Sequence, residues 1–127
     1  MTARTTLALG ALWAALAVAL GAFGAHALKE RLVEAGQLEN WHTAVRYQMW
    51  HALALVLVGV LRERSATPGF LRFPAWGFLI GSLLFSGSIY CLALDVARPV
   101  MGPITPLGGA LVIAAWCSFA WQAWRGA

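Results

Sequence analysis

Residues 73–94 have the sequence FPAWGFLIGSLLFSGSIYCLAL, which contains no charged residue. A helix needs about 20 apolar residues to cross the hydrocarbon core of a bilayer, so this stretch is long enough to span it. Residues 5–25 and 104–124 are also free of charge over a similar length. Three such segments in a chain of 127 residues predict an integral membrane protein.

A fourth apolar segment is interrupted by polar side chains. Residues 49–61 are too short to span alone, and extending the segment back to Trp41 brings in His42 and Arg46. The long Arg46 side chain can reach the membrane interface with its charged end. We therefore predict an all-α, four-helix transmembrane bundle forming one domain over residues 1–127, with spans near residues 5–25, 41–61, 74–94 and 105–124.

The composition agrees with a membrane protein and argues against nucleic-acid binding. Hydrophobic residues make up 61% of the chain and charged residues 11%, against about 25% charged residues in a typical soluble domain. The net charge of +4 comes from basic residues scattered at segment ends, whereas nucleic-acid binding needs a basic stripe or patch. The expected surroundings are the lipid bilayer, without a nucleic-acid partner.

The distribution of basic residues predicts the orientation in the membrane. The side that holds both termini and the middle loop has five arginines and one acidic residue, Glu63. The other side has four basic and four acidic residues. Because short cytoplasmic loops carry an excess of Lys and Arg, we expect both termini in the cytoplasm of a multi-pass protein of the plasma or inner membrane.

Small residues recur at helical spacing in two predicted spans. They form one stripe in the first span, and Gly77 and Gly81 form a GxxxG pattern in the third. Small residues let helix backbones approach closely in lipid. Packing within one subunit and contact between subunits both remain open. The stripe in the first span comprises Gly10, Ala14, Ala17, Gly21 and Gly24.

The segments between the spans contain helix-boundary signals. Residues 26–40 alternate apolar and charged side chains, which predicts a short amphipathic helix at the interface in the first outer loop. Gly36 is the expected end of that helix, and Asn40 is a candidate N-cap for the second span. Thr105 followed by Pro106 is typical of a helix start, so we expect the fourth span to begin there.

Polar side chains within the spans are costly in lipid and therefore mark candidate sites. In a four-span topology most of them lie in one half of the membrane, opposite the termini. His51 lies deepest, about 15 Å from either end of its span at ~1.5 Å per residue, so it requires a partner, for which Tyr90, Ser86 and Ser88 have suitable depths. The candidate polar site consists of His26, Gln48, His51, Ser86, Ser88, Tyr90 and Thr105.

Two interpretations of this cluster stay open. It is either a proton- or ligand-handling site built on His51, oriented by Tyr90 and Gln48, or a set of hydrogen bonds that joins the helices. We identify no catalytic residues, because Asp95 is the only aspartate and no Ser/His/Asp arrangement is present. We expect no metal and no cofactor, because the three histidines lack ligand spacing. The enzymatic interpretation is thus disfavoured.

Four stretches resemble the domain of unknown function 423 family of small UPF0382-type membrane proteins, whose vertebrate relatives are called transmembrane protein 256. They cover nearly the whole chain in order and are GAFGAH (21–26), TAVRYQMWHALAL (43–55), LFSGSIY (84–90) and GPITPLGG (102–109). The resemblance implies a compact four-span membrane protein and brings no assigned catalytic residue. The residues that these stretches share with the polar site are those reached above by depth.

These observations favour a structural or accessory membrane component, because the chain is small and lacks a soluble module. An oligomeric transporter or channel for protons, ions or a small solute is the alternative, motivated by His51. A homo-oligomer and a different membrane-protein partner are both compatible with the sequence.

Overall fold

The computed structural model describes residues 1–67 and 69–126 and consists of five helices there. Four of them are α1 (Ala3–Ala25), α3 (Leu38–Arg64), α4 (Arg72–Ala93) and α5 (Arg98–Arg125), and the short α2 spans Lys29–Glu34. The four long helices are each long and apolar enough to cross a membrane. The predicted all-α fold with four spans is therefore confirmed.

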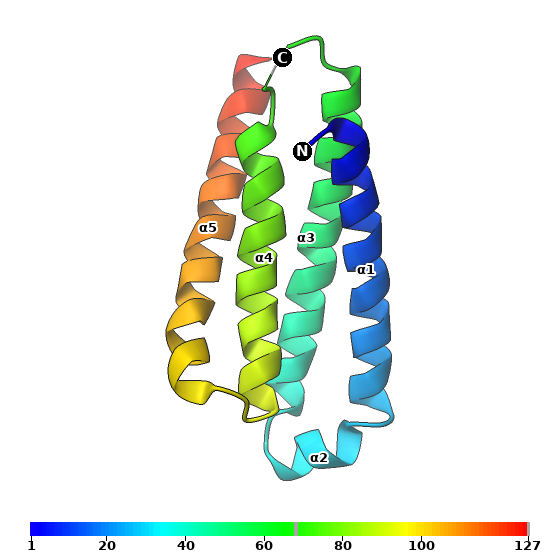
Figure 1. Ribbon diagram of the computed structural model, residues 1–127, viewed down its shortest axis with the longest axis vertical. Helices are drawn as coiled ribbons and strands as arrows, with labels where there is room; N and C mark the ends of the chain where they lie inside the picture. Colours follow the sequence, from blue (N-terminus) through cyan, green and yellow to red (C-terminus); the bar gives the residue numbers. More distant parts are fainter. Residues whose placement is uncertain (68, 127) are drawn as a thin grey trace.

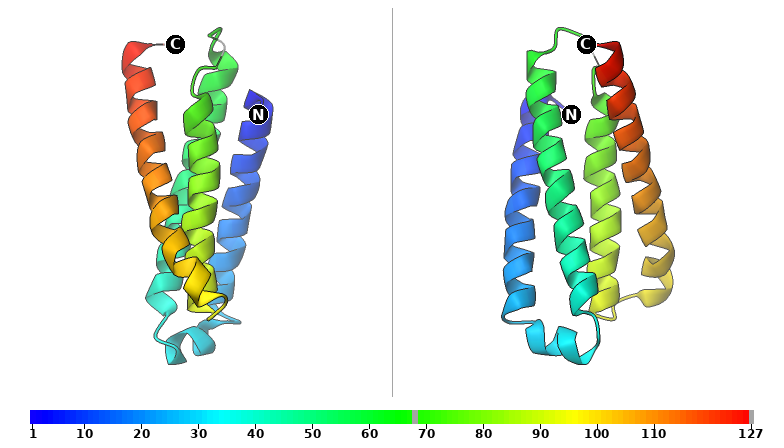
Figure 2. Two further views of the ribbon diagram at one scale, coloured as in Figure 1. Left: turned by 60° about the vertical axis from the view of Figure 1, so that its left-hand side comes forward. Right: turned by 180° about the vertical axis from the view of Figure 1, so that it is seen from behind.

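The long helices stand side by side in the order α1, α3, α4, α5 (Figures 1 and 2). α1 packs mainly on α3, α3 on α4, and α4 on α5. Both termini and the α3–α4 connection lie at one end of the bundle, here called the termini end, and α2 and the α4–α5 connection lie at the opposite α2 end (Figure 1). The two edge helices, α1 and α5, thus each have one principal neighbour.

Close glycine contacts explain why these neighbours pack tightly. A Cβ at Gly10 on α1 would lie 2.9 Å from the backbone nitrogen of Val56 on α3. On the other edge, a Cβ at Gly108 would collide with the Phe85 backbone nitrogen, and one at Gly81 would lie 2.7 Å from Val112 Cγ2. Backbones that approach this closely gain dispersion contacts that large side chains would prevent. Gly10 in the first span and Gly81 in the third therefore pack within the subunit.

Two helices begin earlier than the sequence indicated. α5 begins at Arg98 with Ala97 as its N-cap, so the prediction of a start at Thr105 is wrong, and Pro103 and Pro106 lie inside the helix. Proline removes a backbone hydrogen bond, but spanning helices tolerate it where side chains and neighbours satisfy the freed groups. α3 begins at Leu38, so Asn40 is not its N-cap and lies within the first turn.

The first outer loop contains the expected short helix. In α2, Leu32 is fully buried, whereas Val33 is 54% exposed. Gly36 follows the helix with a φ of +66°, the left-handed conformation expected of its terminator. The helix itself is confirmed, and its position at the membrane interface stays a prediction.

Charges separate between the two ends as the sequence indicated. The termini end has five arginines and Glu63, and Arg4 pairs with Glu63 at 3.7 Å. Arg62 at this end donates to Thr6 Oγ1 and to the Met1 carbonyl, both at 2.9 Å, and thereby fastens the start of α1 to the end of α3. The α2 end balances four basic against four acidic residues. The arginines at the termini end are Arg4, Arg62, Arg64, Arg72 and Arg125.

Candidate functional site

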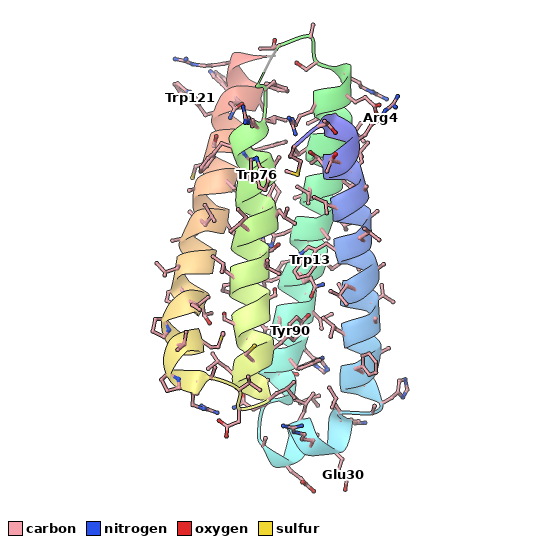
Figure 3. All side chains as sticks on the ribbon, viewed as in Figure 1. Arg4, Trp13, Glu30, Trp76, Tyr90 and Trp121 are labelled. Carbon is pink, nitrogen blue, oxygen red and sulfur yellow. The ribbon has the colours of Figure 1, made fainter. Side chains whose placement is uncertain are left out.

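A buried hydrogen-bonded chain joins α4, α3 and α1. The Tyr90 hydroxyl on α4 donates to Gln48 Oε1 on α3 at 2.7 Å, and Gln48 Nε2 donates to the Trp13 carbonyl on α1 at 3.0 Å. Gln48 is fully buried and Tyr90 is 9% exposed. Trp13 and Tyr90 lie among the helices, whereas Arg4, Glu30 and Trp121 point away from them (Figure 3). Two of the candidate residues therefore form one direct pair.

Trp13 extends this chain back to α4. Its indole Nε1 donates to Ser82 Oγ at 2.9 Å, and Ser82 in turn donates to the Phe78 carbonyl at 2.6 Å. Trp13 is not among the predicted site residues. Its signal was its depth, because a tryptophan in the middle of a span lies far from the interfacial belt that tryptophans favour. Its buried N–H then requires an acceptor inside the protein.

Ser86, Ser88 and Thr105 lie at other helix contacts. Ser86 is fully buried on α4 and donates to the Ala44 carbonyl on α3 at 2.8 Å. Ser88 on α4 and Thr105 on α5 share a hydrogen bond of 2.6 Å between their hydroxyls. Each of these bonds joins two neighbouring helices. None of the three residues contributes a hydrogen bond to His51 in the described part of the chain.

His51 has two partners that differ from those expected. Its Nδ1 lies 2.6 Å from the Tyr47 carbonyl on the preceding turn of α3, and Trp116 Nε1 on α5 lies 3.2 Å from its Nε2. A carbonyl only accepts and an indole N–H only donates. These two contacts assign a neutral imidazole with the proton on Nδ1 and the lone pair on Nε2. The expected bond from Tyr90 to His51 is absent because Tyr90 pairs with Gln48.

His51 lies at the centre of α3. It is 13 residues from each end of the helix, which corresponds to about 20 Å at ~1.5 Å per residue. It is 5% exposed, yet it borders a cavity. This depth exceeds the sequence-based value because α3 begins earlier and ends later than residues 41–61.

The cavity has a volume of about 590 Å³ and lies between α3, α4 and α5. Its walls are aromatic: Tyr47 and Trp50 on α3 pack at 4.9 Å between ring centroids, and Tyr47 also packs on Phe85 of α4 at 4.9 Å. Trp116 completes the wall on α5 and packs on Phe78 at 4.6 Å. The remaining α5 lining is aliphatic and consists of Gly109, Val112 and Ile113.

His26 does not join the other candidates. It caps the C-terminal end of α1 and is exposed. It borders a second, shallower apolar cavity of about 370 Å³ with Ala19, Ala22, Phe23 and Ala27. The seven candidate residues thus form several separate helix contacts and one exposed position rather than a single centre.

The described residues offer no assembled metal site. No group of three or more His, Cys, Asp or Glu side chains comes together among them. Both cysteines, Cys91 and Cys117, are free. In the same part of the chain, every buried side-chain nitrogen and oxygen has a hydrogen-bond partner. The polar side chains inside the bundle are therefore satisfied by one another and by backbone carbonyls.

Comparison with known proteins gives a family for this arrangement. Residues 20–109 match the family described as "Protein of unknown function (DUF423)". The chain belongs to this family. The matched region begins near the end of α1 and ends in α5. It contains all seven candidate residues, whereas Trp116 lies beyond it.

Several family members are similar over most of their length. The UPF0382 membrane protein YwdK of Bacillus subtilis is 43% identical over 113 residues, which cover 89% of this chain and 90% of the relative. A UPF0382 membrane protein of Haemophilus influenzae is 40% identical, with 94% and 93% covered. The UPF0382 membrane protein C1782.12c of Schizosaccharomyces pombe is 37% identical, with 85% and 92% covered. No solved structure matches the chain.

Proposed function

We propose that this DUF423 protein is an accessory component of the plasma or inner membrane that associates with another membrane protein through the outer face of α1. The observation that carries the proposal is a row of exposed alanines along this helix. A face of this kind permits close approach of a second helix. We call it the alanine face, and it consists of Ala8, Ala11, Ala15, Ala19 and Ala22.

The alanine face is not needed for packing inside the subunit. The opposite side of α1 supplies the contacts with α3 through Gly10, Ala17 and Gly24, which are all buried. Since lipid tails are as apolar as a leucine side chain, helices associate in a bilayer through close packing and hydrogen bonds. A second small-residue face on the same helix therefore supports association with a helix outside the subunit.

The charge distribution supports an orientation with the termini end in the cytoplasm. The arginines there lie close to the span ends, where basic residues have the strongest effect on topology. The opposite end has no net charge. Orientation and the specific membrane are both parts of this proposal.

The alternative of an oligomeric transporter or channel has less support. In a transporter or channel, the polar side chains inside the bundle would have to exchange their partners for ions or solute during transport. In the described residues they are already paired between helices, as in Tyr90 with Gln48 and Ser88 with Thr105. This pattern is that of helix–helix attachment.

The mass of the complexes that the protein forms in patches of its native membrane tests the proposal. The protein would be extracted in polymer-bounded nanodiscs and the disc contents weighed by native mass spectrometry. We expect the wild type to be released with a second, different chain, and Ala15→Trp to lose that chain. Leu16→Trp is the matched control, because Leu16 is 44% exposed on the same helix but lies off the alanine face.

Three outcomes would count against the proposal. The wild type could occur alone in the discs, it could occur only with copies of itself, or Ala15→Trp and Leu16→Trp could retain the partner equally.

A further inference from the structure

We infer that the cavity between α3, α4 and α5 binds an uncharged, membrane-dissolved ring compound that carries a hydroxyl group, such as a long-chain phenol or quinol. This inference is independent of the α1 association proposed above, because the cavity lies on the other side of the α3–α4 pair. It depends on the size, lining and polar pair of the cavity.

The size and position of the cavity favour a ligand from the bilayer. A volume of about 590 Å³ falls within the ~300–1,000 Å³ of small-molecule sites. The cavity lies at the depth of His51, the midpoint of α3. α5 packs chiefly on α4, so α3 and α5 leave a groove between them in which the cavity lies. A molecule dissolved in the hydrocarbon core can enter it laterally.

The lining selects against charge and in favour of a flat ring. No lining residue carries a permanent charge, and a carboxylate or phosphate would be left unpaired at high cost in this environment. Tyr47, Phe85 and Trp116 present aromatic rings. Aromatic rings favour offset-stacked and edge-to-face contacts with another ring.

The pair of His51 and Trp116 selects the polar group of the ligand. Trp116 Nε1–H is only a donor, and the lone pair of His51 Nε2 is only an acceptor, because Nδ1 holds the proton. Entry of a ligand between them requires the Trp116 indole to move away from His51, and this side chain is 41% exposed, so the protein does not enclose it on all sides. A ligand that enters between them must accept from one and donate to the other.

A hydroxyl group meets both requirements at once. Its oxygen accepts from Trp116 and its hydrogen is donated to His51 Nε2. An ether or ketone oxygen can satisfy Trp116 but leaves the His51 nitrogen without a donor, and a buried polar atom without a partner weakens binding. The ring fits between the aromatic walls, and the apolar remainder of the molecule stays in the groove or in lipid.

The test compares two probes that differ in one hydrogen-bond donor. 4-Dodecylphenol and its methyl ether would be titrated into the full-length protein in phosphatidylcholine nanodiscs, and the indole ¹H–¹⁵N signal of Trp116 would be followed by NMR. The signal is assigned by its absence in Trp116→Phe. We expect saturable binding of the phenol and at least about tenfold weaker binding of the ether, since the loss of one buried hydrogen bond has this order of effect.

A matched pair of variants tests the location. Ile113 lines the cavity, whereas Leu107 lies outside it on the same helix, and both are 65% exposed. Ile113→Trp should fill the cavity and abolish saturable binding of the phenol, and Leu107→Trp should bind it as the wild type does. The inference is overturned if the phenol does not saturate, if the ether binds equally well, or if Ile113→Trp binds as Leu107→Trp does.

Discussion

Trp116 on α5 donates its indole N–H to Nε2 of His51 on α3 at 3.2 Å, and this is the one side-chain hydrogen bond between these two helices in the described part of the chain. The bond spans the groove between α3 and α5 and borders the aromatic cavity. The contact therefore fastens α5 to α3, and it requires the tautomer in which Nε2 of His51 carries the lone pair.

Replacement of Trp116 by phenylalanine tests the contribution of this bond to stability. The variant leaves His51 Nε2 without its donor, and we expect the free energy of unfolding to fall by about 1 kcal/mol, because hydrogen bonds between membrane helices contribute on the order of 0.6–1.7 kcal/mol. Unfolding by denaturing detergent in bicelles would measure it. Trp124→Phe is the control, since Trp124 is 87% exposed, and an equal loss in both variants would contradict the prediction.

The tautomer of His51 is open to direct observation. We expect ¹⁵N chemical shifts in lipid that show a protonated Nδ1 and an unprotonated Nε2, because Nδ1 lies 2.6 Å from the Tyr47 carbonyl, which can only accept. Trp116→Phe should leave the Nδ1 signal in place and shift that of Nε2. Detection of a proton on Nε2 in the wild type would show that the assignment is wrong.

Gln48 links Tyr90 to Trp13, so its removal should disturb two helix contacts. Gln48→Leu leaves the buried Tyr90 hydroxyl and the Trp13 carbonyl without their partner, and we expect a loss of about 1–3 kcal/mol in the free energy of unfolding. The double variant Gln48→Leu with Tyr90→Phe should recover part of this loss, because no hydroxyl then remains unpaired. Strictly additive losses would indicate that the two side chains do not interact.

Gly108 should tolerate no side chain, because a Cβ there would collide with the Phe85 backbone nitrogen on α4. We expect Gly108→Ala to separate α5 from α4 and to lower the free energy of unfolding by about 1–3 kcal/mol, the usual cost of overpacking. Gly102→Ala on the same helix is the control, since a Cβ at Gly102 meets nothing within 4 Å. The contact would be shown to be unimportant if both variants unfolded at the same detergent concentration.

The orientation can be tested by labelling from each side of the membrane. In a background with Cys91→Ala and Cys117→Ala, a cysteine in the α3–α4 connection, Thr67→Cys, should react only with a reagent admitted to the cytoplasm. Glu30→Cys in α2 should react with an impermeant reagent added outside. The reverse labelling pattern would place the arginine-rich end outside and refute the proposed topology.

The number and order of spans could be predicted because they depend on the length of apolar runs. The start of α5 could not, since Thr105 and Pro106 have the composition of a helix start, yet the chain is already helical from Arg98. Local sequence could not show that Ser88 on α4 would bond Thr105 within the helix. A second local signal competed with this one, since Pro99 lies in the first turn of α5, where proline is favoured.

The depth of the candidate residues in the membrane could be predicted, but the direction in which their side chains point could not. Hydropathy indicates how far a residue lies from the membrane surface, whereas the rotation of each helix about its axis depends on packing across the bundle. Gln48 and Tyr90 were grouped correctly by depth and do pair. The partner of His51 was wrong, because the rotation of α5 brings Trp116 to it and the rotation of α4 directs Tyr90 to Gln48.

The order α1, α3, α4, α5 has a consequence for how the protein is made. Each edge helix packs mainly on the helix next to it in the chain, so the first pair of spans holds most of its own contacts. The hairpin of α1 and α3 can form as soon as α3 has been synthesised, before α4 and α5 have been. The second hairpin can form in the same way and then join the first along α3 and α4. We therefore expect the protein to insert into the membrane as two successive helical hairpins that contact each other mainly through α3 and α4.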